Sequence, residues 1–181
     1  VFNKWSFERK ENRIANIAFR YVYEDRNGGE LQWTPEFRGG DSIYGESIWT
    51  NRYEMIGNYQ LPTKEKIMFQ TSLSKHLQNS VYGDMAYIAD QVIAFNQLYW
   101  GKTIGANSIL VGAAHRYTYY DDNTGATETE IDSAWANLPS KVGLPGIFAQ
   151  DLIKFSERSQ LLLGARLDFH PQHGNVFSPR I

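Results

Sequence analysis

Apolar and polar side chains alternate along residues 160–170, and this period of two limits most strongly what the chain can fold into. Such alternation predicts a strand with one apolar and one polar side. The residues that would share the apolar side are Leu161, Leu163, Ala165, Leu167 and Phe169. The length of the segment, about ten residues, also matches a tilted strand that crosses a bilayer.

The same alternation recurs along the chain and predicts an all-β fold of about nine strands. The expected strands cover residues 5–9, 14–24, 46–61, 66–77, 85–100, 108–120, 147–155 and 160–170, and a last one begins at Gly174. The faces of 85–100 and 147–155 cannot be assigned, because their apolar residues break strict alternation. We expect an antiparallel, up-and-down arrangement.

The connections between these strands alternate in length. Short turns are expected at 10–13, 62–65, 101–107 and 156–159, all on one side of an up-and-down sheet. The other side would carry the loops 25–45 and 121–143 and a polar turn at 78–84. A transmembrane β-barrel of the outer membrane has this asymmetry, although a lipocalin-like barrel could show some of it.

Composition excludes several classes of function. The net charge of −2 does not indicate a nucleic-acid partner. The absence of cysteine excludes disulfides, thiolate catalysis and cysteine-ligated zinc. No run approaches 18 apolar residues, so no transmembrane helix is expected. No catalytic or nucleotide-binding motif occurs, and we expect neither an enzyme nor a cofactor.

Two weak metal signals do not change this expectation. His170 and His173 lie three residues apart in a predicted turn, where a solvated turn is the simpler interpretation. The acidic stretch that begins at Asp121 lacks the residues that an EF-hand requires at its fifth and twelfth positions. A looser calcium site in this stretch has no support in the sequence.

Arginines inside the expected strands indicate which face would meet lipid. An arginine that faces lipid at the bilayer midplane costs roughly 2–4 kcal/mol. We therefore expect Arg20, Arg52, Arg116 and Arg166 to point into a lumen, which leaves mostly apolar neighbours pointing outward. His115 is the exception and would point outward.

Aromatic residues near the strand ends would form two girdles at the membrane interfaces. Those expected on the long-loop side are Tyr21, Tyr23, Trp49, Tyr117 and Tyr119. Those expected on the short-turn side are Tyr59, Tyr99, Trp100 and Phe155. Ordinary strand propensity is the alternative explanation, since Tyr and Trp favour sheets.

Residues 146–181 resemble a known family. The strand LLLGARLDFH, a short loop and GNVFSPRI are similar to the late barrel strands of TonB-dependent outer-membrane receptors, where a G-x-R-x-D strand precedes an F-S-P-R strand start. The segment GIFAQDLIKFSERS is similar to the preceding strand and turn of that family. The segment SIYGESIWTNRYEMIGNYQLP resembles receptors of Bacteroidetes-type bacteria.

The resemblance implies that residues 1–181 are a fragment, namely part of the barrel domain of a receptor in the cell outer membrane. It implies a complete barrel of about 22 strands. The plug domain and TonB box of the family are not in this sequence. The implied function is uptake of a scarce nutrient: a ferric siderophore, haem, cobalamin or an oligosaccharide. The implied partners are TonB, acting through the plug, the small-molecule ligand and outer-membrane lipid.

Candidate ligand contacts lie in the expected lumen and in the long loops. They are Arg20, Trp33, Tyr44, Arg52, Glu54, Arg116, Trp135, Arg166 and Asp168. Exposed aromatic residues on loops are reasonable ligand contacts, but they could equally pack the loops on themselves. A salt-bridge network in the lumen explains Arg52 with Glu54 better than catalysis does. The rival hypothesis is a soluble all-β ligand- or carbohydrate-binding module, motivated by the aromatic-rich loops.

Overall fold

The computed structural model describes residues 1–181, and strands make up most of it. The strands are β1 (Phe2–Ser6), β2 (Ala15–Gly29), β3 (Gly45–Gln60), β4 (Lys66–Tyr82), β5 (Met85–Ile104), β6 (Asn107–Asp122), β7 (Glu128–Ile131), β8 (Ala134–Asn137), β9 (Ser140–Lys154), β10 (Gln160–His170) and β11 (Gly174–Arg180). Three single turns of 3-10 helix are η1 (Lys10–Asn12), η2 (Pro35–Phe37) and η3 (Gly125–Thr127). No helix is long and apolar enough to span a membrane. The predicted all-β class is confirmed.

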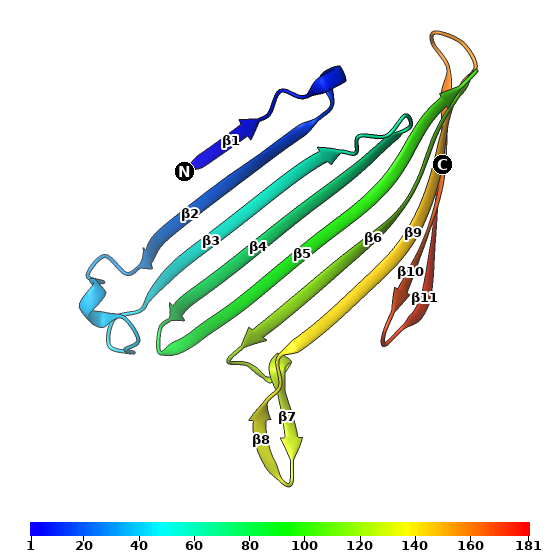
Figure 1. Ribbon diagram of the computed structural model, residues 1–181. Helices are drawn as coiled ribbons and strands as arrows, with labels where there is room; N and C mark the ends of the chain where they lie inside the picture. The colour runs from blue at the N-terminus through cyan, green and yellow to red at the C-terminus, as the bar shows by residue number, and fades with distance from the viewer.

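Nine strands form one antiparallel sheet in the order β1-β2-β3-β4-β5-β6-β9-β10-β11 (Figure 1). Each strand pairs with its neighbour in the chain, except that β6 pairs with β9 across the separate β7–β8 hairpin. The predicted up-and-down arrangement is therefore confirmed. The sheet is open, because β1 and β11 lie at its two edges.

Several strands extend beyond their predicted ends. β4 continues to Tyr82 through the predicted polar turn 78–84, β2 continues to Gly29, and β9 begins at Ser140. Ladder hydrogen bonds between backbones need no apolar side chains, so polar segments can continue a strand. The first strand is also shifted, to Phe2–Ser6 instead of 5–9.

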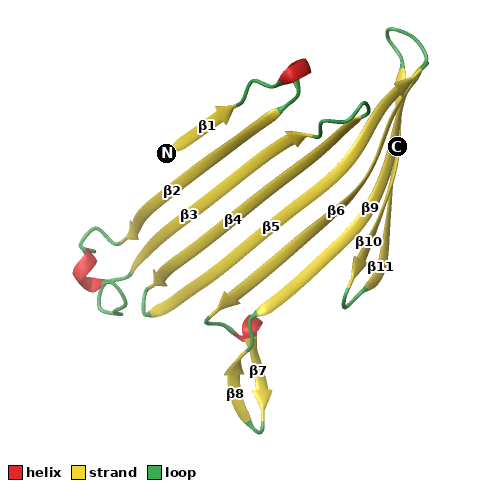
Figure 2. Ribbon diagram, viewed as in Figure 1, coloured by secondary structure: helices red, strands yellow, loops and turns green.

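The connections at the two ends of the sheet are confirmed in part (Figure 2). The four predicted short turns all lie at one end, called here the short-turn end, and the loops 30–44 and 123–139 lie at the other, the long-loop end. The connection between β4 and β5 at the long-loop end, however, has only two residues. Gly83 adopts a φ of 63° there, which favours glycine in such a tight turn.

The predicted loop 121–143 is wrong in one respect, because it contains the β7–β8 hairpin. Its two central residues, Asp132 and Ser133, have φ values of 51° and 65°. Positive φ at both positions is the mark of a type I′ turn, which usually carries Asn-Gly or Asp-Gly. Asp-Ser is a weaker signal, so alternation over four-residue strands did not reveal the hairpin.

The sheet is a single layer without an ordinary core. Only 14 of 181 residues are buried, and the five apolar ones among them are Ala18, Met68, Val81, Ala89 and Ala114. The 120 backbone hydrogen bonds, most of them within the sheet, hold this layer together. Large apolar side chains therefore remain exposed on the sheet.

The sheet is curved. Gln97 of β5 and Arg180 of β11 line the same hollow, although four strand spacings separate their strands. In a flat sheet these strands would lie about 19 Å apart. The sheet must therefore bend toward the face that carries both residues, and Figure 1 shows β9–β11 turned relative to β2–β5.

Candidate ligand-binding face

The register divides the sheet into two faces, because paired residues in a ladder project to the same side. The polar face consists of the even-numbered residues of each strand in the nine-stranded sheet, except that β5 contributes its odd-numbered residues. The remaining residues form the apolar face. The hollow that reveals the curvature is lined mainly by the polar face, which is therefore concave.

All predicted in-strand contacts share the polar face. They are Arg20, Arg52, Glu54, Arg116, Arg166 and Asp168. This face carries nine Lys or Arg residues and five Asp or Glu residues, whereas the apolar face carries three and four. The polar face is thus positively charged in a chain whose net charge is −2, and it favours anionic groups.

One cluster on this face surrounds Glu54. Arg20 of β2 pairs with its carboxylate through Nε, and Arg52 lies 2.6 Å from the other carboxylate oxygen. The Glu54 side chain is only 12% exposed, whereas both arginines are about half exposed. One carboxylate therefore holds two guanidinium groups, and the cluster keeps a surplus positive charge.

A second cluster lies on β10. Arg166 donates from Nε and Nη2 to both carboxylate oxygens of Asp168, at 2.7 Å each, in a bidentate pair. Gly146 lies opposite Asp168 in the ladder, and a Cβ there would lie 2.3 Å from Oδ1. The missing side chain of Gly146 leaves the room that the pair occupies. Arg116 makes no ion pair, so this region also keeps a surplus positive charge.

A ladder of side-chain amides crosses four strands of the polar face. Asn58 donates to Asn16 at 2.9 Å, Gln70 to Asn58 at 2.7 Å, and Gln97 to Gln70 at 2.6 Å. Each donor and acceptor are direct partners in the backbone register. We did not predict this ladder, because the signal is an amide at the same height on successive strands and appears only once the register is known.

The predicted loop aromatics do not join these clusters. The Trp33 ring lies where a side chain on Gly45 would be, and Tyr44 donates to Glu46 at 2.8 Å. Trp33 therefore packs against the start of β3, and Tyr44 bonds to the same strand with its ring beside Gly83 of the β4–β5 turn. Trp135 lies on β8 and is 71% exposed, so it is the free aromatic of this set.

Arg38 fastens the loop 30–44 to the ends of β3 and β4. Its guanidinium lies 3.9 Å from the ring centroid of Trp49 and donates to Asn79 Oδ1 at 2.7 Å. Trp49 and Asn79 belong to the apolar face, so the loop bends over that side. We did not single out Arg38 from the sequence.

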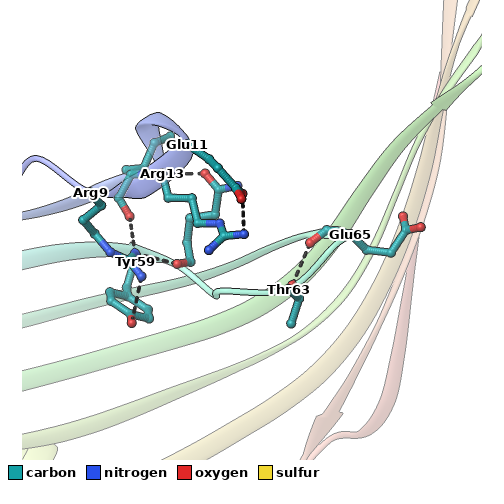
Figure 3. A network of polar contacts seen from close by, with 8 residues as sticks. Arg9, Glu11, Arg13, Tyr59, Thr63 and Glu65 are labelled. Atoms are coloured by element: carbon teal, nitrogen blue, oxygen red, sulfur yellow. Dashed lines mark hydrogen bonds and ion pairs between the residues drawn. The ribbon is translucent and has the colours of Figure 1, made fainter.

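At the short-turn end, Arg9 ties the β1–β2 connection to β3 (Figure 3). It donates to the Gln60 carbonyl at 2.7 Å and to the Tyr59 hydroxyl at 3.0 Å, with its guanidinium 4.2 Å from the centre of that ring. In the next turn, Thr63 donates to the Glu65 carbonyl at 2.7 Å. These contacts fix the turns locally.

The apolar face exposes a large apolar side chain on every strand of the sheet. Examples in sheet order are Trp5, Phe19, Tyr53, Leu73, Leu98, Val111, Ile147, Leu163 and Phe177. Polar residues interrupt this face, but some are paired: Lys75 donates to Asp90 at 2.6 Å, and Thr71 to Asn96 at 2.8 Å. Exposed apolar side chains on every strand of a sheet are more than single surface residues would give, and they make this face a candidate contact surface.

Most predicted girdle aromatics lie on the apolar face. Near the long-loop end they are Tyr21, Tyr23, Trp49, Tyr117 and Tyr119, and near the short turns they are Tyr59 and Trp100. Tyr99 is a correction, because the register places it on the polar face. The faces of β5 could not be assigned from its sequence. His115 lies on the apolar face, as expected.

Comparisons with known proteins do not add to this geometry. Comparison with family models, curated proteins and solved structures found no match to this chain. No group of three or more His, Asp or Glu residues could hold a metal ion.

Proposed function

We propose that this chain is part of the wall of an outer-membrane β-barrel of the TonB-dependent receptor type. The polar face lines the lumen, and the apolar face contacts lipid. One observation carries the proposal: every strand of a single curved sheet exposes large apolar side chains on the convex face, while the two arginine clusters lie on the concave face. A hydrocarbon environment is the solvent that suits such a face.

Strand length supports this placement. β3, β4, β5 and β6 have 16, 17, 20 and 16 residues, whereas a tilted strand crosses a bilayer in about 9–11. The excess lies toward the long-loop end, where the apolar face becomes polar at Asp25, Asn79 and Asp121. In the proposal these ends project from the membrane, with the long loops outside the cell.

The two free edges of the sheet support a larger barrel. β1 and β11 present backbone groups without a neighbouring strand, and lipid does not tolerate such edges. We propose that further strands pair with both edges to close a larger barrel. In receptors of this type a plug domain fills the barrel and contacts TonB.

The proposed receptor takes up a scarce small-molecule nutrient. The candidate contacts are the two arginine clusters on the polar face and Trp135 on its projecting hairpin. Their surplus positive charge supports an anionic ligand or ligand group. The resemblance of residues 146–181 to late strands of the receptor barrel supports uptake driven by TonB.

Cell fractionation of the full-length protein tests this function. We expect the protein in the outer-membrane fraction, soluble only with detergent, and migrating faster on gels before heating than after it. Recovery of folded protein from the soluble fraction without detergent would contradict the proposal. That result would favour the soluble ligand-binding module instead.

A further inference from the structure

A hollow of about 430 Å³ lies on the polar face near β11. Its side chains come mainly from Gln97, Phe148, Gln150, Arg166, Ser178 and Arg180. The volume falls in the range of small-molecule sites. Neither its shape nor its chemistry depends on what covers the opposite face, so it can be judged apart from the proposed membrane location.

Gly164 is one of the residues that line the hollow. In the ladder it pairs with Gln150 on one side and Arg180 on the other, and all three belong to the polar face. A Cβ at Gly164 would make ordinary contacts of 3.5 Å with Gln150 and 3.7 Å with Arg180. The backbone therefore does not require glycine here, and its absent side chain leaves space between an amide and a guanidinium.

The polar groups around this space keep unused hydrogen-bonding capacity. Arg180 makes no ion pair and no side-chain hydrogen bond. The side chains of Gln150 and Ser178 also make no hydrogen bond. Arg166 uses Nε and Nη2 for Asp168, which leaves Nη1 free. Donors with a positive charge thus converge on one end of the hollow.

The amide ladder fixes what the hollow presents at its other end. Gln97 donates from Nε2 to Gln70, whose own amide donates to Asn58. Each amide thus orients the next, and the last one turns Gln97 Oε1 away from Gln70. Oε1 makes no hydrogen bond within the chain, so the hollow combines a free acceptor with free cationic donors.

We propose that this hollow binds a carboxylate-bearing polyhydroxylated molecule, such as an acidic sugar. The carboxylate pairs with the guanidinium of Arg180, which matches it in a bidentate geometry. Hydroxyl groups donate to Gln97 Oε1 and accept from Arg166 Nη1 and the Gln150 amide. Phe148 offers an apolar surface for the carbon skeleton.

The test compares two sugars with the same skeleton, D-glucuronate and D-glucose, by titration calorimetry of the full-length protein in a detergent without sugar headgroups. We expect glucuronate to bind with a Kd of about 1 mM or lower. Glucose, which lacks the carboxylate, should bind at least ~10-fold more weakly, and Arg180→Gln should weaken glucuronate ~10–100-fold without changing glucose. Equal binding of both sugars, or no binding of glucuronate, would overturn the proposal.

A second variant tests the site without removing charge. Gly164→Val should occupy the space between Gln150 and Arg180 and weaken glucuronate binding at least ~10-fold while preserving the fold. Gly101→Val is the matched control, because Gly101 lies on the same face with its nearest atom 3.9 Å from a notional Cβ. It should bind glucuronate like the wild type. Unchanged glucuronate binding in a folded Gly164→Val protein would overturn the proposed binding site. Cell fractionation tests the membrane location separately.

Discussion

Gly146 is the residue whose replacement should disturb the polar face most directly. A Cβ there would lie 2.3 Å from Asp168 Oδ1 and 3.1 Å from the Leu167 carbonyl. Gly146→Ala should therefore lower the free energy of unfolding by about 1–3 kcal/mol. Urea unfolding in lipid vesicles measures this change. Gly101→Ala is the control, and equal stability of the two variants would contradict the steric argument.

Glu54 should contribute to the stability of the fold, because its carboxylate lies between two arginines. Glu54→Gln leaves Arg20 and Arg52 without their shared counter-charge in a position that is 12% exposed. We expect a loss of about 1–2 kcal/mol in the free energy of unfolding. Glu24→Gln is a matched control on the same face, because the Glu24–Arg26 pair is well exposed and should contribute little. Similar losses in both variants would show that burial of Glu54 has no role.

At the scale of single elements, Asp122 organises the corner between β6 and η3. Its carboxylate accepts hydrogen bonds from the Tyr120 hydroxyl at 2.6 Å and from the Thr124 backbone at 2.9 Å. Asp122 lies beyond the apolar stretch of β6, which ends at Tyr119. The Tyr120 bond above all, with those from Thr124 and Thr127, holds the pKa of this carboxyl below its ordinary value.

The lowered pKa of Asp122 predicts that the stability of this corner depends on pH. Because the folded pKa is the lower one, the stabilisation is complete above the ordinary Asp pKa of about 3.9 and is lost as pH falls through the folded value. Hydrogen exchange of the Thr124 amide should therefore accelerate, beyond its intrinsic pH effect, only in that acidic range. Asp122→Asn should show fast exchange at neutral pH, whereas Glu128→Gln should not. Wild-type protection in Asp122→Asn would contradict this account.

Along β10, the cost of a charge should depend on depth in the membrane. Ala165 lies at the middle of the apolar stretch and Leu161 at its short-turn end. Ala165→Arg should cost about 2–4 kcal/mol in vesicles, and Leu161→Arg about 0–1. Folding titrations of both variants measure the difference. An exposed strand in water would tolerate both substitutions alike, so equal small costs would contradict lipid contact.

The elements that alternation predicted well are those whose two faces differ in polarity. β10 begins and ends where it was predicted, and Arg20 and Arg166 share a face as expected. The predicted strand 66–77 ends before β4 does, because Gln78 and Ser80 are typical of turns. In the structure Gln78 donates to Ser80 at 2.8 Å on the polar face, so side-chain hydrogen bonds replace apolar packing there.

For the whole molecule, the sequence predicted the strand order and, through the expected partial barrel, a curved sheet, but it did not predict the hollow. The hollow depends on which residues lie side by side across strands, and the register supplies that information only once the sheet exists. Gln97 and Arg180 are 83 positions apart in the numbering and line the same hollow because the sheet bends. The open edges likewise leave closure of the barrel as a proposal.

Cysteine labelling along β10 measures most directly whether the two faces of the sheet meet different solvents. The chain has no cysteine of its own, so single cysteines can be placed in it after any cysteines elsewhere in the full-length protein are replaced by serine. A membrane-impermeant maleimide applied to outer-membrane vesicles with permeable lumens should label positions 162, 164, 166 and 168. Positions 163, 165 and 167 should react only after detergent denaturation. Alternating labels would support lipid on one face, and uniform labelling of all seven positions would contradict it.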